Sequence, residues 1–199
     1  MRIALFGMSA DPPHREHGKI LWWLAQQFDH VAVWAADNPF KEHQCPLSDR
    51  FTMLNLMIHD LAIPETAVGL YEDLSHRRSW VSAQRAQAKW PQAELTLVIG
   101  ADLVEQLPRW YKATELFQIV NILVIPRPGY HPSEDALTKI RQQGGRIAIA
   151  DTLKTVPISS SYYRQTEDPN ALPPAVSAYI NQRNLYPCTE SSKEKQPIS

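Results

Sequence analysis

The chain has 199 residues, of which 44% are apolar and 21% are charged, and its formal net charge is −1. This composition is typical of a soluble globular protein that buries a core without disulfide or metal staples. A nearly neutral chain has no overall attraction for nucleic acid or anionic lipid, so local groups must bind any anionic ligand.

Cysteine usage and the lack of long apolar runs indicate the compartment in which the protein resides. Cys45 and Cys188 are far apart and form no CxxC pair, which favours a reducing compartment. The apolar run at the N-terminus is too short for a signal peptide, and no run approaches the roughly 20 residues that span a bilayer. We therefore expect a cytoplasmic protein with no nucleic-acid or membrane partner. The sequence does not indicate an oligomeric state.

Six short apolar runs predict β-strands. Most of them are near-continuous rather than alternating, which is typical of strands buried on both faces of a parallel sheet. The runs are RIALF (2–6), HVAVWA (30–35), AVGLYE (67–72), LTLVIG (95–100), NILVIP (121–126) and RIAIAD (146–151).

Helical spacing of apolar residues appears between these runs and again after the last one. We expect helices over 18–28, 47–61, 79–90, 133–143 and 172–183. Ser48 and Ser133 are predicted N-caps of the second and fourth helices. Two glycines, at 144 and 145, are a stop signal for the fourth helix.

The alternation of strands and helices predicts an α/β fold, a single Rossmann-like, doubly wound, mostly parallel sheet with right-handed crossovers. No repeat or internal linker divides the chain, so we expect one domain over 1–188 and a disordered polar tail over 189–199. Sheets of this type bind ligands beyond the C-terminal ends of their strands, near the point where the strand order reverses.

The loop after the first predicted strand, LFGMSADPPHREHGKI (5–20), carries the first candidate site. His14 and His17 share one face at the start of a helix, where free N–H groups attract anions and two imidazoles can donate to phosphate oxygens. A metal site would need further ligands, and Asp11 is the one local carboxylate that is well placed to help. Surface histidines on a helix are a further alternative. The position after a strand and Gly7 favours phosphate.

The segment VIGADLVEQLPRWYKATELF (98–117) carries a second candidate site. Gly100 ends a buried strand, so Asp102 lies at the edge of the sheet where ligands bind. Pro108 breaks a short helix, and Trp110 follows in the break. The indole is suited to stacking on a planar ring, although a buried structural tryptophan fits the pattern equally well.

Two cations follow other predicted strands at the same edge. Lys41 comes after the second strand and Arg127 after the fifth. Each one alone is typical of a solvated surface charge, whereas several cations that converge from different strand ends favour an anion site.

The segment TVPISSSYYR (155–164) follows the last predicted strand and is the third candidate site. Helix-start N–H groups, the hydroxyls of Ser159 and Ser160 and the guanidinium of Arg164 together suit a polyphosphate. An ordinary serine cap beside a solvated arginine is the alternative. The chain contains no P-loop, no GxGxxG fingerprint and no GxSxG elbow.

These segments together resemble a known superfamily over residues 1 to about 185. The first loop is similar to the pattern G-[GT]-[ST]-F-D-P-x-H-x-G-H of the HxGH-type nucleotidylyltransferases, and ISSSYYR is similar to their ISSTxxR signature. The segment VIGADLVEQLPRWYKATELF and the segment DNPFKEHQCPLSDRFTMLNLMI (37–58) narrow the resemblance to the nicotinate-mononucleotide adenylyltransferase family.

The resemblance implies adenylyl transfer from ATP to nicotinate mononucleotide, giving deamido-NAD and pyrophosphate, with Mg²⁺ held mainly by the ATP phosphates and no metal ligated by the protein. It implies catalytic roles for His14, His17 and Arg164. The implied ATP-binding residues are Gly7, Met8, Ser9, His14, His17, Gly100, Asp102, Ile158, Ser159, Ser160 and Arg164. The implied substrate-binding residues are Lys41, Ser79, Ser82, Asp102, Trp110 and Arg127.

Three residues of the first loop depart from the family pattern. Met8 stands where a second glycine is usual, Ala10 where phenylalanine is usual, and Glu16 where the glycine of HxGH would be. A Glu16 carboxylate that pointed inward would weaken nucleotide binding by ~1–2 kcal/mol, whereas one that pointed to solvent would favour the helix dipole. An enzyme with another acceptor, nicotinamide mononucleotide or phosphopantetheine, and a non-catalytic nucleotide-binding protein are therefore the alternatives.

Overall fold

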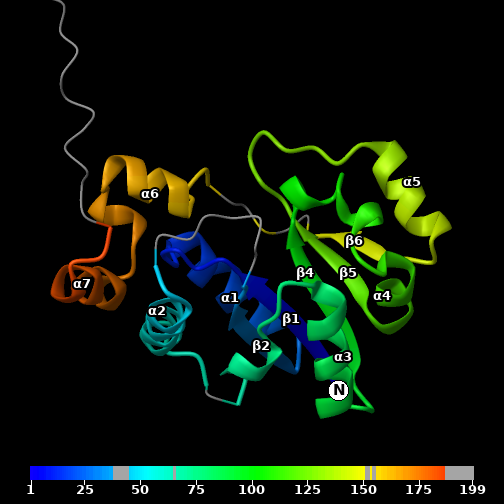
Figure 1. The fold of residues 1–199 in the computed structure, drawn as a ribbon, viewed down its shortest axis with the longest axis horizontal. Coiled ribbons are helices and arrows are strands. Elements are labelled where there is room, and N and C mark those ends of the chain that lie inside the picture. The colour runs from blue at the N-terminus through cyan, green and yellow to red at the C-terminus, as the bar shows by residue number, and fades with distance from the viewer. Residues whose placement is uncertain (38–44, 65, 151–152, 154–155, 187–199) are drawn as a thin grey trace, which may run out of the picture.

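The computed structural model describes residues 1–37, 45–64, 66–150, 153 and 156–186. Six strands form one sheet in the order β3-β2-β1-β4-β5-β6, and every neighbouring pair is parallel (Figure 1). The strands are β1 Arg2–Met8, β2 His30–Ala35, β3 Val68–Leu70, β4 Glu94–Gly100, β5 Asn121–Ile125 and β6 Ile147–Ile149. The predicted fold class is confirmed, and the sheet is parallel throughout.

The strand order reverses between β1 and β4. Ala4 of β1 pairs with Val31 of β2 on one side and with Thr96 of β4 on the other. The carboxyl ends of these two neighbouring strands, Met8 and Gly100, therefore lie on either side of the crevice where an open α/β sheet binds its ligand.

In the described residues, seven α-helices connect or follow the strands. They are α1 Arg15–Gln27, α2 Leu47–Asp60, α3 Ser79–Lys89, α4 Ala113–Ile119, α5 Glu134–Gln142, α6 Ser160–Thr166 and α7 Pro174–Arg183. In Figure 1, α6 and α7 lie with α2 at one end of the sheet, and α4 and α5 lie at the other end with β6. None of the helices in the described ranges is long and apolar enough to cross a membrane.

The helix boundaries confirm one predicted cap and correct another. Ser133 caps α5, and its Oγ accepts a hydrogen bond from the Ala136 N–H at 3.1 Å. Ser48 does not cap α2, because Pro46 holds the N-cap position and Ser48 lies in the first turn. The short helix α4 was not predicted, since it begins after Lys112, whose left-handed backbone (φ 53°) the sequence pattern does not reveal.

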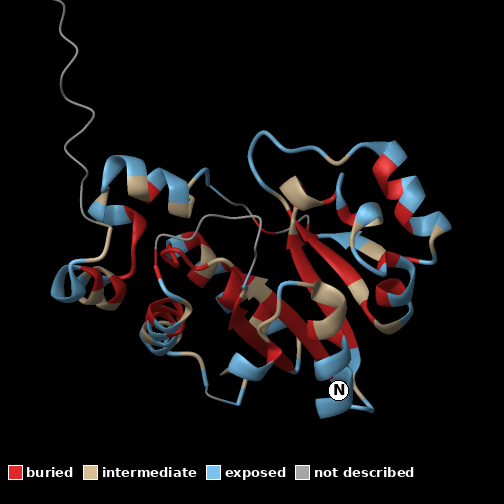
Figure 2. Cartoon of the chain, viewed as in Figure 1, coloured by how far each residue is buried: buried red, intermediate tan, exposed pale blue. Residues whose placement is uncertain are grey.

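The central strands are buried on both faces, which is why their sequences read as continuous apolar runs (Figure 2). Every residue of β2 is buried, whereas β6 at the edge of the sheet leaves Ile149 exposed. The predicted tail over 189–199 lies outside the described residues.

A buried arginine ties α2 to the ligand-binding edge. Arg50 is 2% exposed, and its Nη1 donates to the carbonyl oxygens of Ser9 and Ala36 at 2.8 and 2.9 Å. These carbonyls follow β1 and β2, so the guanidinium holds both strand ends in place. Burial lowers the pKa of Arg50, and the nearby carboxylate of Asp11 opposes that shift.

Candidate active site

The loop after β1 delivers two histidines to the start of α1. His14 is the N-cap residue, and its backbone N–H donates to Nδ1 of His17 at 3.2 Å. The two imidazole rings stack with their centroids 3.6 Å apart and their planes 23° from parallel. Because Nδ1 of His17 accepts a hydrogen bond, the proton of the neutral ring sits on Nε2, where it is a donor.

The ring of His14 is buried and incompletely satisfied. The residue is 6% exposed, and its Nδ1 has no hydrogen-bond partner among the described residues. Burial, together with the smaller effect of the Arg127 charge, lowers the pKa of His14 from 6.5 to about 3. The His14 side chain faces the backbone N–H of His17 in a capping-box arrangement, although no hydrogen bond within ordinary limits joins them.

A pH experiment tests the burial of His14. Its folded pKa lies below its unfolded pKa, so the unfolded chain takes up the proton first as the pH falls, and stability is lost between about pH 6.5 and 3. Between pH 7 and pH 4.5, wild type should lose roughly 2–3 kcal/mol more free energy of unfolding than His14→Asn, measured by urea denaturation. The exposed His59 is the control, and His59→Asn should follow wild type. Equal losses in His14→Asn and wild type would contradict the burial of a neutral imidazole.

The surroundings of the histidine pair do not resemble a metal site. The described residues contain no group of three or more His, Cys, Asp or Glu side chains placed to hold a metal ion. Asp11 is buried, and its Oδ1 accepts a hydrogen bond from the Tyr186 hydroxyl at 2.7 Å, while Nη1 of Arg164 lies 4.0 Å from its Oδ2. Burial raises the pKa of Tyr186, so this hydroxyl stays protonated. Asp11 is therefore engaged with protein partners, and the phosphate interpretation of the histidine pair stays a prediction.

The second signature packs directly on the first loop. Ser160 Oγ donates to the carbonyl oxygen of Pro12 at 2.9 Å, and Nη1 of Arg164 donates to the carbonyl oxygen of Asp11. Ser159 caps α6 by accepting from the Tyr162 N–H at 3.0 Å. The alternative interpretation of this segment was an ordinary serine cap beside a solvated arginine. The serine cap is present, but the arginine is not solvated, because the Arg164 side chain is only 21% exposed.

At the end of β4, two predicted ligand residues pair with each other. Oδ2 of Asp102 accepts from Nη1 of Arg127 at 3.0 Å, which joins the ends of β4 and β5. The carboxylate folds back over Gly100, where an added Cβ would lie 2.4 Å from Oδ1. Both charged side chains are partly exposed, and Arg127 acts electrostatically on His14. This pair therefore lies at the strand reversal, within electrostatic range of His14.

The predicted ATP-binding residues at the end of β1 also have structural roles. An added Cβ on Gly7 would lie 2.5 Å from the Trp34 ring, so the glycine makes room for an indole on the neighbouring strand. The carbonyl of Met8 accepts from the Ala36 N–H at 2.7 Å, and the carbonyl of Ser9 accepts from Arg50. Contacts of Gly7, Met8 and Ser9 with nucleotide stay predictions.

The tryptophan of the middle segment is followed in sequence by two members of a partly exposed cluster of cations and rings. Trp110 is half-buried against the core. In this cluster, the guanidinium of Arg78 lies 3.7 Å from the ring centroid of Tyr111, and Nζ of Lys112 lies 4.2 Å from that of Trp80. The basic stretch 75–79 and the Trp-Tyr pair are visible in the sequence, but their convergence is not.

The remaining predicted substrate contacts differ in burial. Ser82 is 1% exposed, and its Oγ has no hydrogen-bond partner among the described residues, so its contact with substrate stays a prediction. Ser79, in the first turn, and Ile158, before α6, are half-buried and accessible in part. Lys41 lies outside the described residues.

Glu16, which replaces the family glycine, is buried and bonded within the protein. The residue is 7% exposed, so it does not point to solvent. Its Oε2 accepts a hydrogen bond from the Val156 N–H at 3.0 Å, and Nζ of Lys19 lies 3.8 Å from its Oε1. The carboxylate is thus engaged with the segment that leads into α6.

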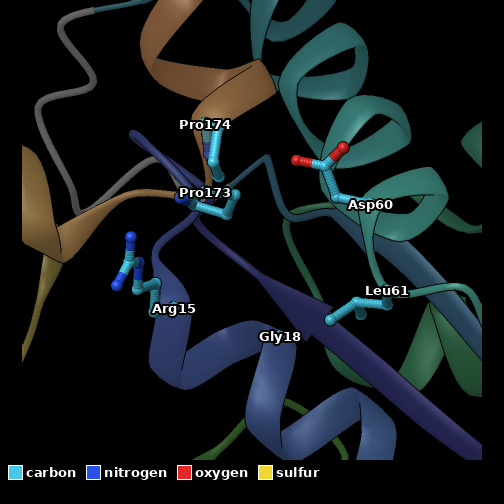
Figure 3. Close-up of a pocket in the computed structure, with 6 residues that line it drawn as sticks. All are labelled: Arg15, Gly18, Asp60, Leu61, Pro173 and Pro174. Atoms are coloured by element: carbon cyan, nitrogen blue, oxygen red, sulfur yellow. The ribbon is translucent and has the colours of Figure 1, made fainter.

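A surface pocket of about 360 Å³ lies apart from these residues, between α1, the end of α2 and the start of α7 (Figure 3). Two charged side chains line it, and both contact backbone groups. Nε of Arg15 donates to the carbonyl of Leu172 at 3.0 Å, and Oδ2 of Asp60 accepts from the Ala175 N–H at 3.3 Å. None of the predicted site residues lines this pocket, and we assign it no ligand.

Comparison with known proteins decides the family. Residues 5–166 match the cytidylyltransferase-like family model. A protein of Synechocystis sp. named "Probable nicotinate-nucleotide adenylyltransferase" is 48% identical over 198 residues, covering 94% of this chain and 99% of that protein. The chain belongs to the nicotinate-nucleotide adenylyltransferases of the cytidylyltransferase-like family.

More distant members of the family agree with this assignment. The "Nicotinate-nucleotide adenylyltransferase" of Bacillus subtilis is 24% identical, covering 93% of this chain and 98% of its own. The Plasmodium falciparum nicotinic acid mononucleotide adenylyltransferase complexed with NaAD has a TM-score of 0.78 at 19% identity, covering 93% of this chain and 97% of that one. The structural match shows that the adenylyltransferase fold is shared.

Proposed function

We propose that this protein transfers the adenylyl group of ATP to nicotinate mononucleotide, giving deamido-NAD and pyrophosphate. The observation that carries the proposal is the direct contact between the His14–His17 loop and the Ser159–Arg164 signature at the strand reversal. Family membership supports the same reaction. Solved relatives are complexed with NaAD and with APC.

The reaction needs charge stabilisation rather than a protein nucleophile. An oxygen of the mononucleotide 5′-phosphate attacks the α-phosphorus of ATP, and the bond to the pyrophosphate oxygen breaks. Negative charge then grows on the departing pyrophosphate. We assign His17 Nε2–H and the guanidinium of Arg164 as donors to that charge, because preorganised donors in a partly buried site favour the transition state.

His14 contributes through its burial. In the free protein its imidazole is neutral, because burial lowers its pKa to about 3. Negative phosphate oxygens beside the ring would favour the charged form and raise this pKa.

Magnesium in this proposal is carried by the nucleotide. Among the described residues, the carboxylate of Asp11 is hydrogen-bonded to Tyr186, and that of Asp102 is paired with Arg127. This donor set fits a cation held by phosphate oxygens better than one held by side chains. When bound, Mg²⁺ neutralises part of the phosphate charge, and the residues of this chain position the phosphates.

The mononucleotide would bind on the β4 side of the reversal. We assign Asp102 and Trp110 to its recognition, with the indole stacked on the pyridine ring. Arg127 and Ser79 are further candidate contacts.

We place this enzyme in the reducing cytoplasm. The single described cysteine, Cys45, is buried and forms no disulfide, which agrees with that location.

An acceptor panel tests the proposal. The purified chain is supplied with ATP and Mg²⁺, and with nicotinate mononucleotide, nicotinamide mononucleotide or phosphopantetheine in separate reactions, while pyrophosphate release is followed. Turnover fastest with nicotinate mononucleotide is the expected result. Faster turnover with another acceptor would transfer the assignment to that acceptor. ATP binding by calorimetry without any turnover would identify a non-catalytic nucleotide-binding protein.

A further inference from the structure

Glu16 links the two signatures of the site. It lies in the first turn of α1 between His14 and His17, at the position where the HxGH pattern has glycine. Its Oε2 accepts from the N–H of Val156, which is three residues before the α6 cap Ser159. Glycine has no side chain that could make this contact.

The two described residues at the Glu16 contact are exposed, whereas Leu153 and Ile158 on either side of them pack against the core. The side chain of Val156 is 45% exposed, and the following Pro157 is exposed as well, so neither packs this stretch against the core. Farther along, Ser160 and Arg164 hold α6 to the carbonyls of Pro12 and Asp11. The Glu16 contact extends this attachment to the chain before the helix.

The negative charge of Glu16 is compensated where it lies. One oxygen accepts the Val156 N–H, and the ammonium of Lys19 lies 3.8 Å from the other. The carboxylate also lies at the N-terminal end of α1, where the helix dipole favours an anion. The repulsion expected between a carboxylate and bound phosphates is therefore reduced.

We propose that Glu16 is a positioning residue that holds the segment before α6 against α1, so that Ser159, Ser160 and Arg164 are in place before the triphosphate arrives. This inference rests on the proposed function. It reverses the expectation from the family pattern, because restoring glycine at this position would remove the contact rather than repair the loop.

Three variants test the role of Glu16. Glu16→Gly and Glu16→Ala remove the acceptor, whereas Glu16→Gln keeps an oxygen that can accept from Val156. We expect the first two to raise KM for ATP about tenfold while KM for nicotinate mononucleotide changes less than twofold, and we expect Glu16→Gln to stay within about threefold of wild type in both. Glu134→Gly is the matched control, because Glu134 is an exposed glutamate in the first turn of α5.

Amide exchange in the nucleotide-free protein gives a readout that does not depend on turnover. Exchange at Val156 should be about tenfold faster in Glu16→Gly than in wild type, and near wild type in Glu16→Gln. If wild type turns over none of the acceptors, the proposed function fails, but this measurement still tests the contact.

Two results would overturn the inference. One is a Glu16→Gly enzyme with wild-type or higher kcat/KM for ATP. The other is a Glu16→Gln enzyme as impaired as Glu16→Gly while Val156 exchange stays at the wild-type rate, since the charge itself would then be what matters. The melting temperature of each variant is measured first and identifies any variant that does not fold. If Glu16→Gly and Glu16→Ala do not fold, the comparison of Glu16→Gln with wild type tests the inference.

Discussion

Replacement of His17 by alanine is expected to lower kcat by about 10²–10³-fold, the usual effect of removing one donor to a developing negative charge. The reason lies in the geometry of the pair. The N–H of His14 holds Nδ1 of His17 at 3.2 Å, and the ring stacks on His14, so Nε2–H is presented in one orientation. Steady-state pyrophosphate release with saturating ATP and nicotinate mononucleotide measures the effect.

The exposed His59 on α2 supplies the control for this prediction. Its Nδ1 bonds to the backbone oxygen of Asn55 within its own helix. His59→Ala should therefore keep kcat within about twofold of wild type. A kcat for His17→Ala as high as that of the control, in a variant that melts at the wild-type temperature, would remove His17 from the mechanism.

Replacement of Arg164 by lysine is expected to lower kcat/KM for ATP by about 10²-fold, although the positive charge is kept. In this structure the guanidinium uses Nη1 on the carbonyl of Asp11 and Nη2 on Ser161 Oγ at 3.3 Å. An ammonium group cannot hold the loop and face a phosphate with the same fixed fork. The loss should fall on ATP rather than on the mononucleotide, because the signature is assigned to the phosphates.

Arg141 on α5 provides the matched control for Arg164. Its side chain is 56% exposed, and its ion pair with Glu134, at 3.9 Å, is a surface contact that contributes little. Arg141→Lys should change kcat/KM for ATP less than twofold. If Arg164→Lys also stayed within twofold, the guanidinium would serve the fold of the loop and not the nucleotide.

The secondary structure was predictable because the physical signals are local. Strands buried on both faces must be apolar at almost every position, so the near-continuous apolar runs marked the central strands, and further short runs marked β3 and β6 at the edges. The signal failed where local chemistry was ambiguous. Ser48 reads as a helix cap but lies inside α2, and α4 begins after a left-handed Lys112 that no sequence pattern marks.

The candidate site was predictable in part for a different reason. Parallel strands place their carboxyl ends at one edge, so loops after β1 and β4 and the segment after β6 were expected to converge. The contacts of Ser160 and Arg164 with the first loop confirm that the two signatures meet. The roles assigned to individual residues remain predictions that the variants above test.

The sequence by itself determined the order of elements, the parallel sheet and the edge where the histidines and the serine-rich signature gather, because periodicity and strand direction depend on neighbours along the chain. Only the tertiary structure decided which side chains contact one another at this edge of the sheet. It buried the hydroxyl of Ser82, paired Asp102 with Arg127 and turned Glu16 toward Val156, 140 residues away. Such contacts depend on distances between elements remote in sequence, which no local pattern contains.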